Sequence, residues 1–233
     1  MPRRHFDPAP EALPRLLPIF PLPGALLLPG GKLPLNVFEP RYLAMIDDAL
    51  RTHRMIGMIT PLPDEVREEE APHRPVADTY VIGCAGRLVG FNETDDGRYV
   101  VSLAGLSRFR VVEEVASTRG YRQVATDWTG FEADLEAYPE DAPSILDRDR
   151  LIVLLKQFFQ NHNMSAEWDA FREATEETLI TVLSMSCPFS VPEKQALLEA
   201  ATLAKRAETL MTMLEFAVAD PAGLVGAVGR GVA

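Results

Sequence analysis

The chain has 233 residues and a formal net charge of −11, which makes it an acidic protein. This balance argues against a nucleic-acid binder, because such proteins neutralise phosphates with lysine and arginine, and against binding to an anionic membrane surface. Hydrophobic residues make up 47% of the chain, which is enough for a substantial core. Only two cysteines occur and neither lies in a C-x-x-C motif, so we expect a protein of the reducing cytoplasm.

The first apolar stretch, residues 17–37, predicts two buried strands separated by turns. Five prolines interrupt it, and each one disfavours helix in the residue before it. The stretch therefore cannot be a membrane helix, which needs about 20 uninterrupted apolar residues. Residues 30–32, Gly-Gly-Lys, indicate a turn and not a phosphate-binding loop, since Leu33 stands where that loop needs Ser or Thr. A helix then begins at Pro40, with Leu43, Ile46, Ala49 and Leu50 on its apolar face.

The next part of the chain predicts further strands and a sheet that curls on itself. Asp95, Asp96 and Gly97 supply the turn of a hairpin. Gly83, Gly86 and Gly90 mark bends, bulges or close approach of the backbone within one strand. About six strands with one early helix favour a barrel-like sheet. The expected strands after the helix are residues 55–59, 79–91, 99–103, 109–112 and 121–128.

The last third of the chain predicts three amphipathic helices in a small bundle. Ser144 with Asp147 resembles a capping box, and Ser165 is expected to cap a second helix that runs through Val182. Ser190 with Glu193 forms a full capping box for a third helix, which we expect to continue past Leu214.

These patterns divide the chain into five expected segments. The segments are a flexible arm (1–14), a barrel-like subdomain (15–131), an acidic connector (132–149), a helical bundle (150–219) and a disordered tail (220–233). The long acidic loop between residues 61 and 78 is interpreted as a solvated insertion into the barrel-like subdomain.

Residues suited to catalysis or metal binding do not cluster in the sequence. None of the four histidines has a partner at metal-ligand spacing, so we expect no metal and no cofactor. His53 follows a helix end, where a cation suits the helix dipole, and His162 also closes a helix. Cys84 lies within a strand of small residues and Cys187 at a helix end, and neither has a base nearby in sequence. We therefore expect no catalytic residues and no enzyme.

Three motifs in order resemble the N-terminal substrate-binding domain of Lon proteases. The first runs from the opening prolines to Val37-Phe38-Glu39-Pro40-Arg41-Tyr42. The second is Gly105-Leu106-Ser107-Arg108-Phe109-Arg110, and the third is the Lys194-Gln195 pair followed by apolar residues. The chain looks closest to the bacterial proteins that carry this domain alone, and the resemblance spans residues 16–216.

The resemblance implies an α+β fold, with a PUA-like pseudo-β-barrel, one early helix and a small C-terminal helical bundle. It also implies a non-catalytic module that binds an unfolded or degron-bearing polypeptide, or a partner protein, in an adaptor or chaperone-like role linked to proteolysis. Strand addition at an open sheet edge or an apolar groove could serve such recognition. The resemblance places the candidate polypeptide-binding residues at Phe38, Glu39, Arg41 and Tyr42.

Two alternatives remain open on the sequence. A cryptic hydrolase or peptidase could use Cys84 or a carboxylate pair assembled in space. PUA-like barrels can also bind RNA, although the acidic charge and the absence of a basic stripe weigh against it. At Phe38 to Tyr42 a purely structural interpretation also stands, with Phe38 in the core and Glu39 paired locally with Arg41.

Overall fold

A computed structural model describes residues 8–63, 78–139, 141–165 and 168–220. The chain divides into two compact units, Met1–Tyr138 and Pro139–Ala233. The division falls within the segment expected to be a connector. The first seven residues of the expected arm, most of the expected insertion and nearly all of the expected tail lie outside the described residues.

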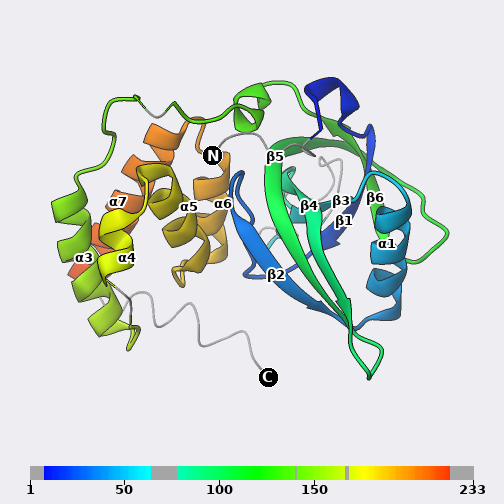
Figure 1. Ribbon diagram of the computed structural model, residues 1–233, viewed down its shortest axis with the longest axis horizontal. Helices are drawn as coiled ribbons and strands as arrows, with labels where there is room; N and C mark the ends of the chain where they lie inside the picture. The colour runs from blue at the N-terminus through cyan, green and yellow to red at the C-terminus, as the bar shows by residue number, and fades with distance from the viewer. Residues whose placement is uncertain (1–7, 64–77, 140, 166–167, 221–233) are drawn as a thin grey trace. The chain divides into compact units, whose positions relative to one another are not determined.

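The first unit is built on one six-stranded sheet that curls into a ring (Figure 1). The strand order is β2-β5-β4-β3-β1-β6, and β5 also pairs with β6, which closes a ring of five strands with β2 attached to one half of β5. All pairings are antiparallel except that of β1 with β3. The strands are β1 (Leu16–Pro21), β2 (Lys32–Val37), β3 (Met55–Ile59), β4 (Ile82–Glu93), β5 (Tyr99–Val115) and β6 (Arg122–Asp127).

The core of this unit lies inside the ring and confirms the predicted barrel-like sheet. The two segments expected as separate strands at 99–103 and 109–112 form one long strand, β5. Leu26, Leu27 and Leu28 are buried but belong to no strand. One cluster of buried side chains contains Leu17, Ile19, Met55, Ile59, Ala85, Leu106, Phe109, Val111 and Val124.

Two glycines of β4 are required by the close packing inside the ring. A Cβ at Gly83 would lie 2.6 Å from the carbonyl oxygen of Met58 and 2.7 Å from the Phe109 ring. A Cβ at Gly86 would lie 2.7 Å from Leu27, next to a register shift between β4 and β5. The predicted bulges and close approaches are therefore real, and glycine allows them because it has no side chain.

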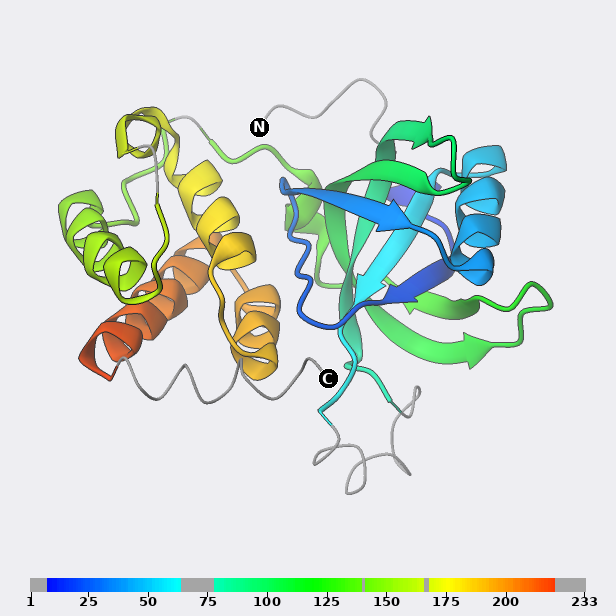
Figure 2. The same cartoon turned by 90° about the horizontal axis from the view of Figure 1, so that it is seen from below.

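Helix α1 (Pro40–Arg51) packs against one side of the barrel (Figure 2). Two tyrosines of the sheet region donate hydrogen bonds to carboxylates of this helix. The Tyr99 hydroxyl donates to Asp47 at 3.2 Å, and the Tyr121 hydroxyl donates to Asp48 at 2.8 Å. The buried face is formed by Tyr42, Met45, Ile46 and Ala49. Leu43 and Leu50, expected on that face, are only half-buried, because the face is turned toward Tyr42 and Met45.

His53 lies in the turn after α1, at the helix end where a cation would suit the dipole. Its Nδ1 accepts a hydrogen bond from the backbone N–H of Met55 at 3.1 Å. Burial lowers the pKa of His53 and so favours the neutral ring.

The second unit is helical, as predicted, but has five helices in its described residues where three were expected. The predicted second helix is broken at Thr175, whose side chain caps a new helix by accepting from the Thr178 N–H. The predicted third helix is broken before Thr202, which caps the last helix in the same way. The helices are α3 (Arg148–Asn161), α4 (Trp168–Glu173), α5 (Glu176–Ser186), α6 (Val191–Glu199) and α7 (Leu203–Ala219). Helix α7 contacts α3, α5 and α6.

The capping predictions in this unit had mixed outcomes. The box of Ser190 and Glu193 is confirmed, with the Ser190 N–H donating to the glutamate at 2.7 Å. Ser144 does not cap α3; Asp147 does, by accepting from the Arg150 N–H at 3.0 Å. The Ser144 hydroxyl instead donates to Glu176 at the start of α5. Across the described ranges, no helix is long and apolar enough to cross a membrane.

Candidate functional site

The chain between β2 and α1 brings the first candidate residue to the surface. Side chains alternate along β2, so that Leu35 and Val37 point into the barrel and are at least nine-tenths buried. Phe38 follows Val37 and is 64% exposed. The structural interpretation of Phe38 as a core residue is therefore wrong, because Val37 occupies the core position.

Glu39 and Arg41 form the local ion pair that the structural interpretation expected. Glu39 is the N-cap residue of α1, but its carboxylate caps no backbone N–H. It accepts instead from Arg41, at 2.9 Å from Nε and 2.7 Å from the terminal nitrogen. Both side chains are about half exposed. Such exposed pairs contribute little to stability, so both groups can exchange this contact for one with a ligand.

Tyr42 lies beneath this surface and not on it. Its side chain is 7% exposed and its ring centroid is 4.1 Å from that of Phe20 in β1. The Arg41 guanidinium carbon lies 4.7 Å from the centroid of the Tyr42 ring. Burial raises the pKa of Tyr42, so the phenol stays neutral. Tyr42 thus fixes α1 on the barrel and supports Arg41, while Phe38, Glu39 and Arg41 face outward.

Beside Phe38, one set of paired positions on the outer face of the sheet carries uncharged side chains. The sheet register places Val100 of β5 between Asn36 of β2 and Asn92 of β4. Val100 is 44% exposed, and both asparagines are exposed. Since side chains alternate along a strand, Phe38 continues the same side as Asn36. Asn36 and Phe38 thus share one side of the segment that leads to the Glu39–Arg41 pair, and Val100 and Asn92 follow on the neighbouring strands.

Neither cysteine is placed as a nucleophile. Cys84 and Cys187 are each 1% exposed. Burial raises the pKa of the Cys187 thiol to about 12, so it is protonated at neutral pH and unreactive. Within the described ranges, no three His, Cys, Asp or Glu side chains gather in a way that could hold a metal ion.

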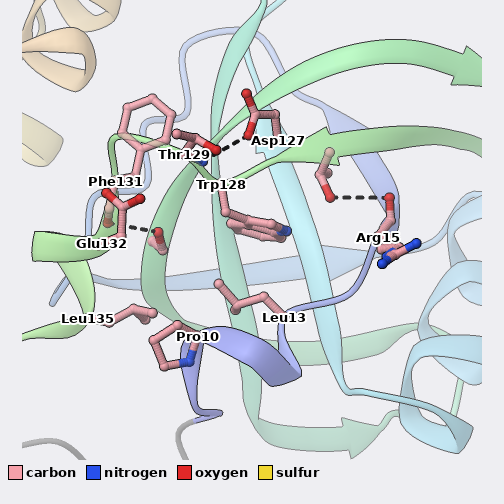
Figure 3. A pocket seen from close by; sticks show the side chains of 11 residues that line it. Pro10, Leu13, Arg15, Asp127, Trp128, Thr129, Phe131, Glu132 and Leu135 are labelled. Carbon is pink, nitrogen blue, oxygen red and sulfur yellow. Dashed lines mark hydrogen bonds between the residues drawn. The ribbon is translucent and has the colours of Figure 1, made fainter.

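A pocket that the sequence did not predict lies in the barrel unit (Figure 3). Its volume is about 360 Å³, and its walls come from β6 and from two short 3₁₀ helices, η1 (Pro10–Ala12) and η3 (Glu132–Leu135). Trp128 lies at its centre. Because the wall residues come from positions more than 110 residues apart, only the closed barrel brings them together.

The pocket wall is held in place by a buried ion pair. Arg108 of β5 and Asp134 of η3 have side chains only 5% and 8% exposed. The carboxylate accepts from Arg108 Nε at 2.8 Å, from its terminal nitrogen at 2.8 Å and from its backbone N–H at 2.9 Å. The Arg108 guanidinium also lies 5.0 Å from the centre of the Phe131 ring. These contacts fix η3 against the barrel.

Comparison with known proteins identifies the family. Residues 16–215 match the ATP-dependent protease La (LON) substrate-binding domain. A Lon protease from Flavobacterium johnsoniae is 30% identical over 206 residues, which cover 87% of this chain and 24% of that protein. Lon protease 2 from Myxococcus xanthus is 40% identical over 105 residues, 45% of this chain and 12% of that protein. The chain thus spans less than a quarter of the length of these relatives.

Solved structures agree with this match. The Lon N-terminal domain protein from Xanthomonas campestris is 25% identical and has a TM-score of 0.52, with 84% of this chain and 97% of that chain covered. The N-terminal domain of a Mycobacterium avium complex Lon protease, at 14% identity and a TM-score of 0.58, shares the fold over 86% of this chain and 98% of its own. The chain belongs to the family of Lon substrate-binding domains.

Proposed function

We propose that this chain binds polypeptides through the Phe38 surface, which consists of Asn36, Phe38, Glu39, Arg41 and Val100. The observation that carries this proposal is that Phe38, 64% exposed, lies next in sequence to the exposed Glu39–Arg41 pair and continues the outer side of Asn36, whose partner Val100 is also exposed. Exposure alone would not distinguish it, since single apolar side chains are common on protein surfaces and Phe216 of α7 is 72% exposed. Burying such a ring contributes about 1.5–3 kcal/mol to a complex.

The chemistry of the Phe38 surface suits an unfolded chain. The ring and Val100 offer apolar contact, and the amide of Asn36 can both donate to and accept from a peptide backbone. Glu39 and Arg41 can pair with either charge. A site of this composition recognises exposed apolar segments without demanding one sequence. It fits a role in selecting substrates for proteolysis, as the name of the matched domain suggests.

Recognition through side chains is favoured over addition of a strand to β2. The Gly30 N–H donates to the Gly105 carbonyl, and the Gly105 N–H donates to the Gly31 carbonyl. Along β2, every second residue after Gly31 directs its backbone N–H and C=O toward β5, and the residues between them direct theirs toward the unpaired edge of β2. Pro34 is one of the residues on the unpaired side. Proline has no N–H to offer an added strand, and natural sheets use it to block such edges.

The test is binding of a permanently unfolded, carboxymethylated protein without nucleotide, measured with the Phe38→Ser variant. We expect its affinity to fall by roughly 10–150-fold, which corresponds to the loss of one buried aromatic contact. Val112→Ser is the matched control, because Val112 is 53% exposed on β5 and lies outside the Phe38 surface. Equal affinities for the wild type and both variants would refute the proposal.

A further inference from the structure

Both apolar and polar side chains line the pocket around Trp128. Pro10, Leu13 and Leu135 gather on one side of the indole in Figure 3, and the carboxylate of Glu132 lies at the rim. The indole packs toward the barrel core, with its ring centroid 5.8 Å from that of Phe109. We call this cavity the Trp128 pocket. Its volume of about 360 Å³ is of the size that binds one large side chain with adjacent backbone.

Three hydrogen-bond donors of the pocket wall, those of Trp128, Thr126 and Ser107, already have acceptors within the protein. The Trp128 indole N–H donates to the carbonyl of Pro14 at 3.1 Å, and the Thr126 hydroxyl donates to the same carbonyl at 2.8 Å. The Ser107 hydroxyl donates to the Arg108 carbonyl at 3.0 Å. These three groups are therefore not available to a ligand in the pocket.

A carboxylate acceptor remains available at the rim. Glu132 uses one carboxylate oxygen to accept from the Gly130 N–H at 3.1 Å. Asp127 uses one to accept from the Thr129 N–H at 2.9 Å. Glu132 therefore keeps a second oxygen for a ligand, whereas Asp127 also accepts from the Thr129 hydroxyl and pairs across the sheet with the position of Arg110. The one cation that lines the pocket, Arg15, is exposed and lies on the opposite side of the indole from Glu132 in this view.

We propose that the Trp128 pocket binds a basic side chain, arginine or lysine, presented by a polypeptide. The apolar stem of that side chain lies against Leu13, Leu135 and the indole, as such stems do on apolar surfaces. Its charged end donates to Glu132. Arginine is favoured over lysine, because its planar guanidinium pairs with a carboxylate through two bonds and stacks on an indole face.

This site is separate from the Phe38 surface and shares no residue with it. It selects a different class of residue, a cation in place of an apolar group. It therefore stands or falls independently of the function proposed above.

The test uses the full chain and unstructured glycine–serine peptides that carry one central arginine, lysine, leucine or glutamate. Binding is followed by NMR through the two tryptophan indole N–H signals, which a Trp168→Phe variant assigns. The Trp128 signal reports on the pocket, and the Trp168 signal is an internal reference, because Trp168 lies in the other unit. We expect the arginine peptide to shift only the Trp128 signal, and the glutamate peptide to shift neither.

The deciding variant is Glu132→Gln, which keeps an acceptor for the Gly130 N–H and removes the charge. Its affinity for the arginine peptide should fall about tenfold, the usual loss of a charged hydrogen-bond partner. Glu136→Gln is the matched control, since Glu136 is exposed just beyond η3 and does not line the pocket. The proposal is overturned if the leucine peptide binds as tightly as the arginine peptide, if Glu132→Gln binds as tightly as wild type, or if no peptide moves the Trp128 signal.

Discussion

Replacing Asp134 by asparagine should destabilise the barrel unit far more than loss of a surface charge. The change keeps the shape of the side chain and removes its negative charge. Arg108 would then remain as a cation with a side chain only 5% exposed. Three hydrogen bonds to the carboxylate, all between 2.8 and 2.9 Å, would be lost or weakened.

The expected cost is about 3–5 kcal/mol of the free energy of unfolding, the range found when one partner of a buried ion pair is removed. Most of this cost is the penalty for an uncompensated buried charge. The double variant Arg108→Met, Asp134→Asn should therefore recover much of it, since both charges are gone, the combined volume is nearly kept and the amide oxygen can still accept from the backbone N–H of residue 108. An isolated exposed pair contributes only about 0–1 kcal/mol.

Urea unfolding followed by the fluorescence of Trp128, in a Trp168→Phe background, measures these differences. The matched control is Glu114→Gln, which removes a carboxylate that accepts from Arg122 at 2.8 Å but is 38% exposed. The reasoning is refuted if Asp134→Asn and Glu114→Gln lower the free energy of unfolding by similar amounts, or if the double variant is less stable than Asp134→Asn.

Three further predictions follow from groups in tight or buried positions. Gly83→Ala places a Cβ 2.7 Å from the Phe109 ring and should lower the free energy of unfolding by about 1–3 kcal/mol, whereas Gly90→Ala, with its nearest neighbour at 3.2 Å, should cost less in the same urea titration. Burial raises the pKa of Cys187 to about 12, so its thiol should resist alkylation at about pH 8 in the native protein and react once urea unfolds it; rapid native labelling would contradict this. Burial lowers the pKa of His53, so its stabilising contribution is present above the unfolded pKa of about 6.5 and is lost as the pH falls through the folded pKa. His53→Asn should flatten that pH dependence of the urea midpoint, and an unchanged profile would show that other groups cause it.

Much of the fold could be predicted because local signals agreed with the tertiary structure. The prolines of the opening stretch, the Asp95–Gly97 turn and the glycines of β4 each act within a few residues. The capping box of Ser190 and Glu193 is likewise a local device, and the structure confirms it. The β2 and α1 junction was located correctly for the same reason.

The misses arose where distant contacts decide between local alternatives. Ser144 has the right spacing for a cap, but Glu176 from α5 attracts its hydroxyl and Asp147 caps α3. Thr175 and Thr202 are capping residues that mark the two helix breaks in the sequence. The breaks were not predicted because apolar residues at helical spacing continue on the far side of each.

Only part of the candidate site could be predicted from the sequence, for the same reason. The resemblance to Lon domains made Phe38, Glu39, Arg41 and Tyr42 candidates, but it could not show that Phe38 faces outward while Tyr42 lies against Phe20. The exposure of Phe38 depends on which residues of β2 point outward, and the burial of Tyr42 depends on how α1 packs against the barrel. The Trp128 pocket has no sequence signal at all, because its walls meet only when the barrel closes.

The most direct test of polypeptide binding at the Phe38 surface is site-specific photo-crosslinking. A photo-reactive phenylalanine analogue is placed at position 38 or, as a control, at position 112, where the native valine is 53% exposed. The chain is then irradiated with a labelled unfolded protein in the absence of nucleotide. The account predicts a crosslink from position 38 that excess unlabelled client suppresses, and a much weaker one from position 112. Absence of the crosslink at 38, or equal yields at both positions, would contradict it.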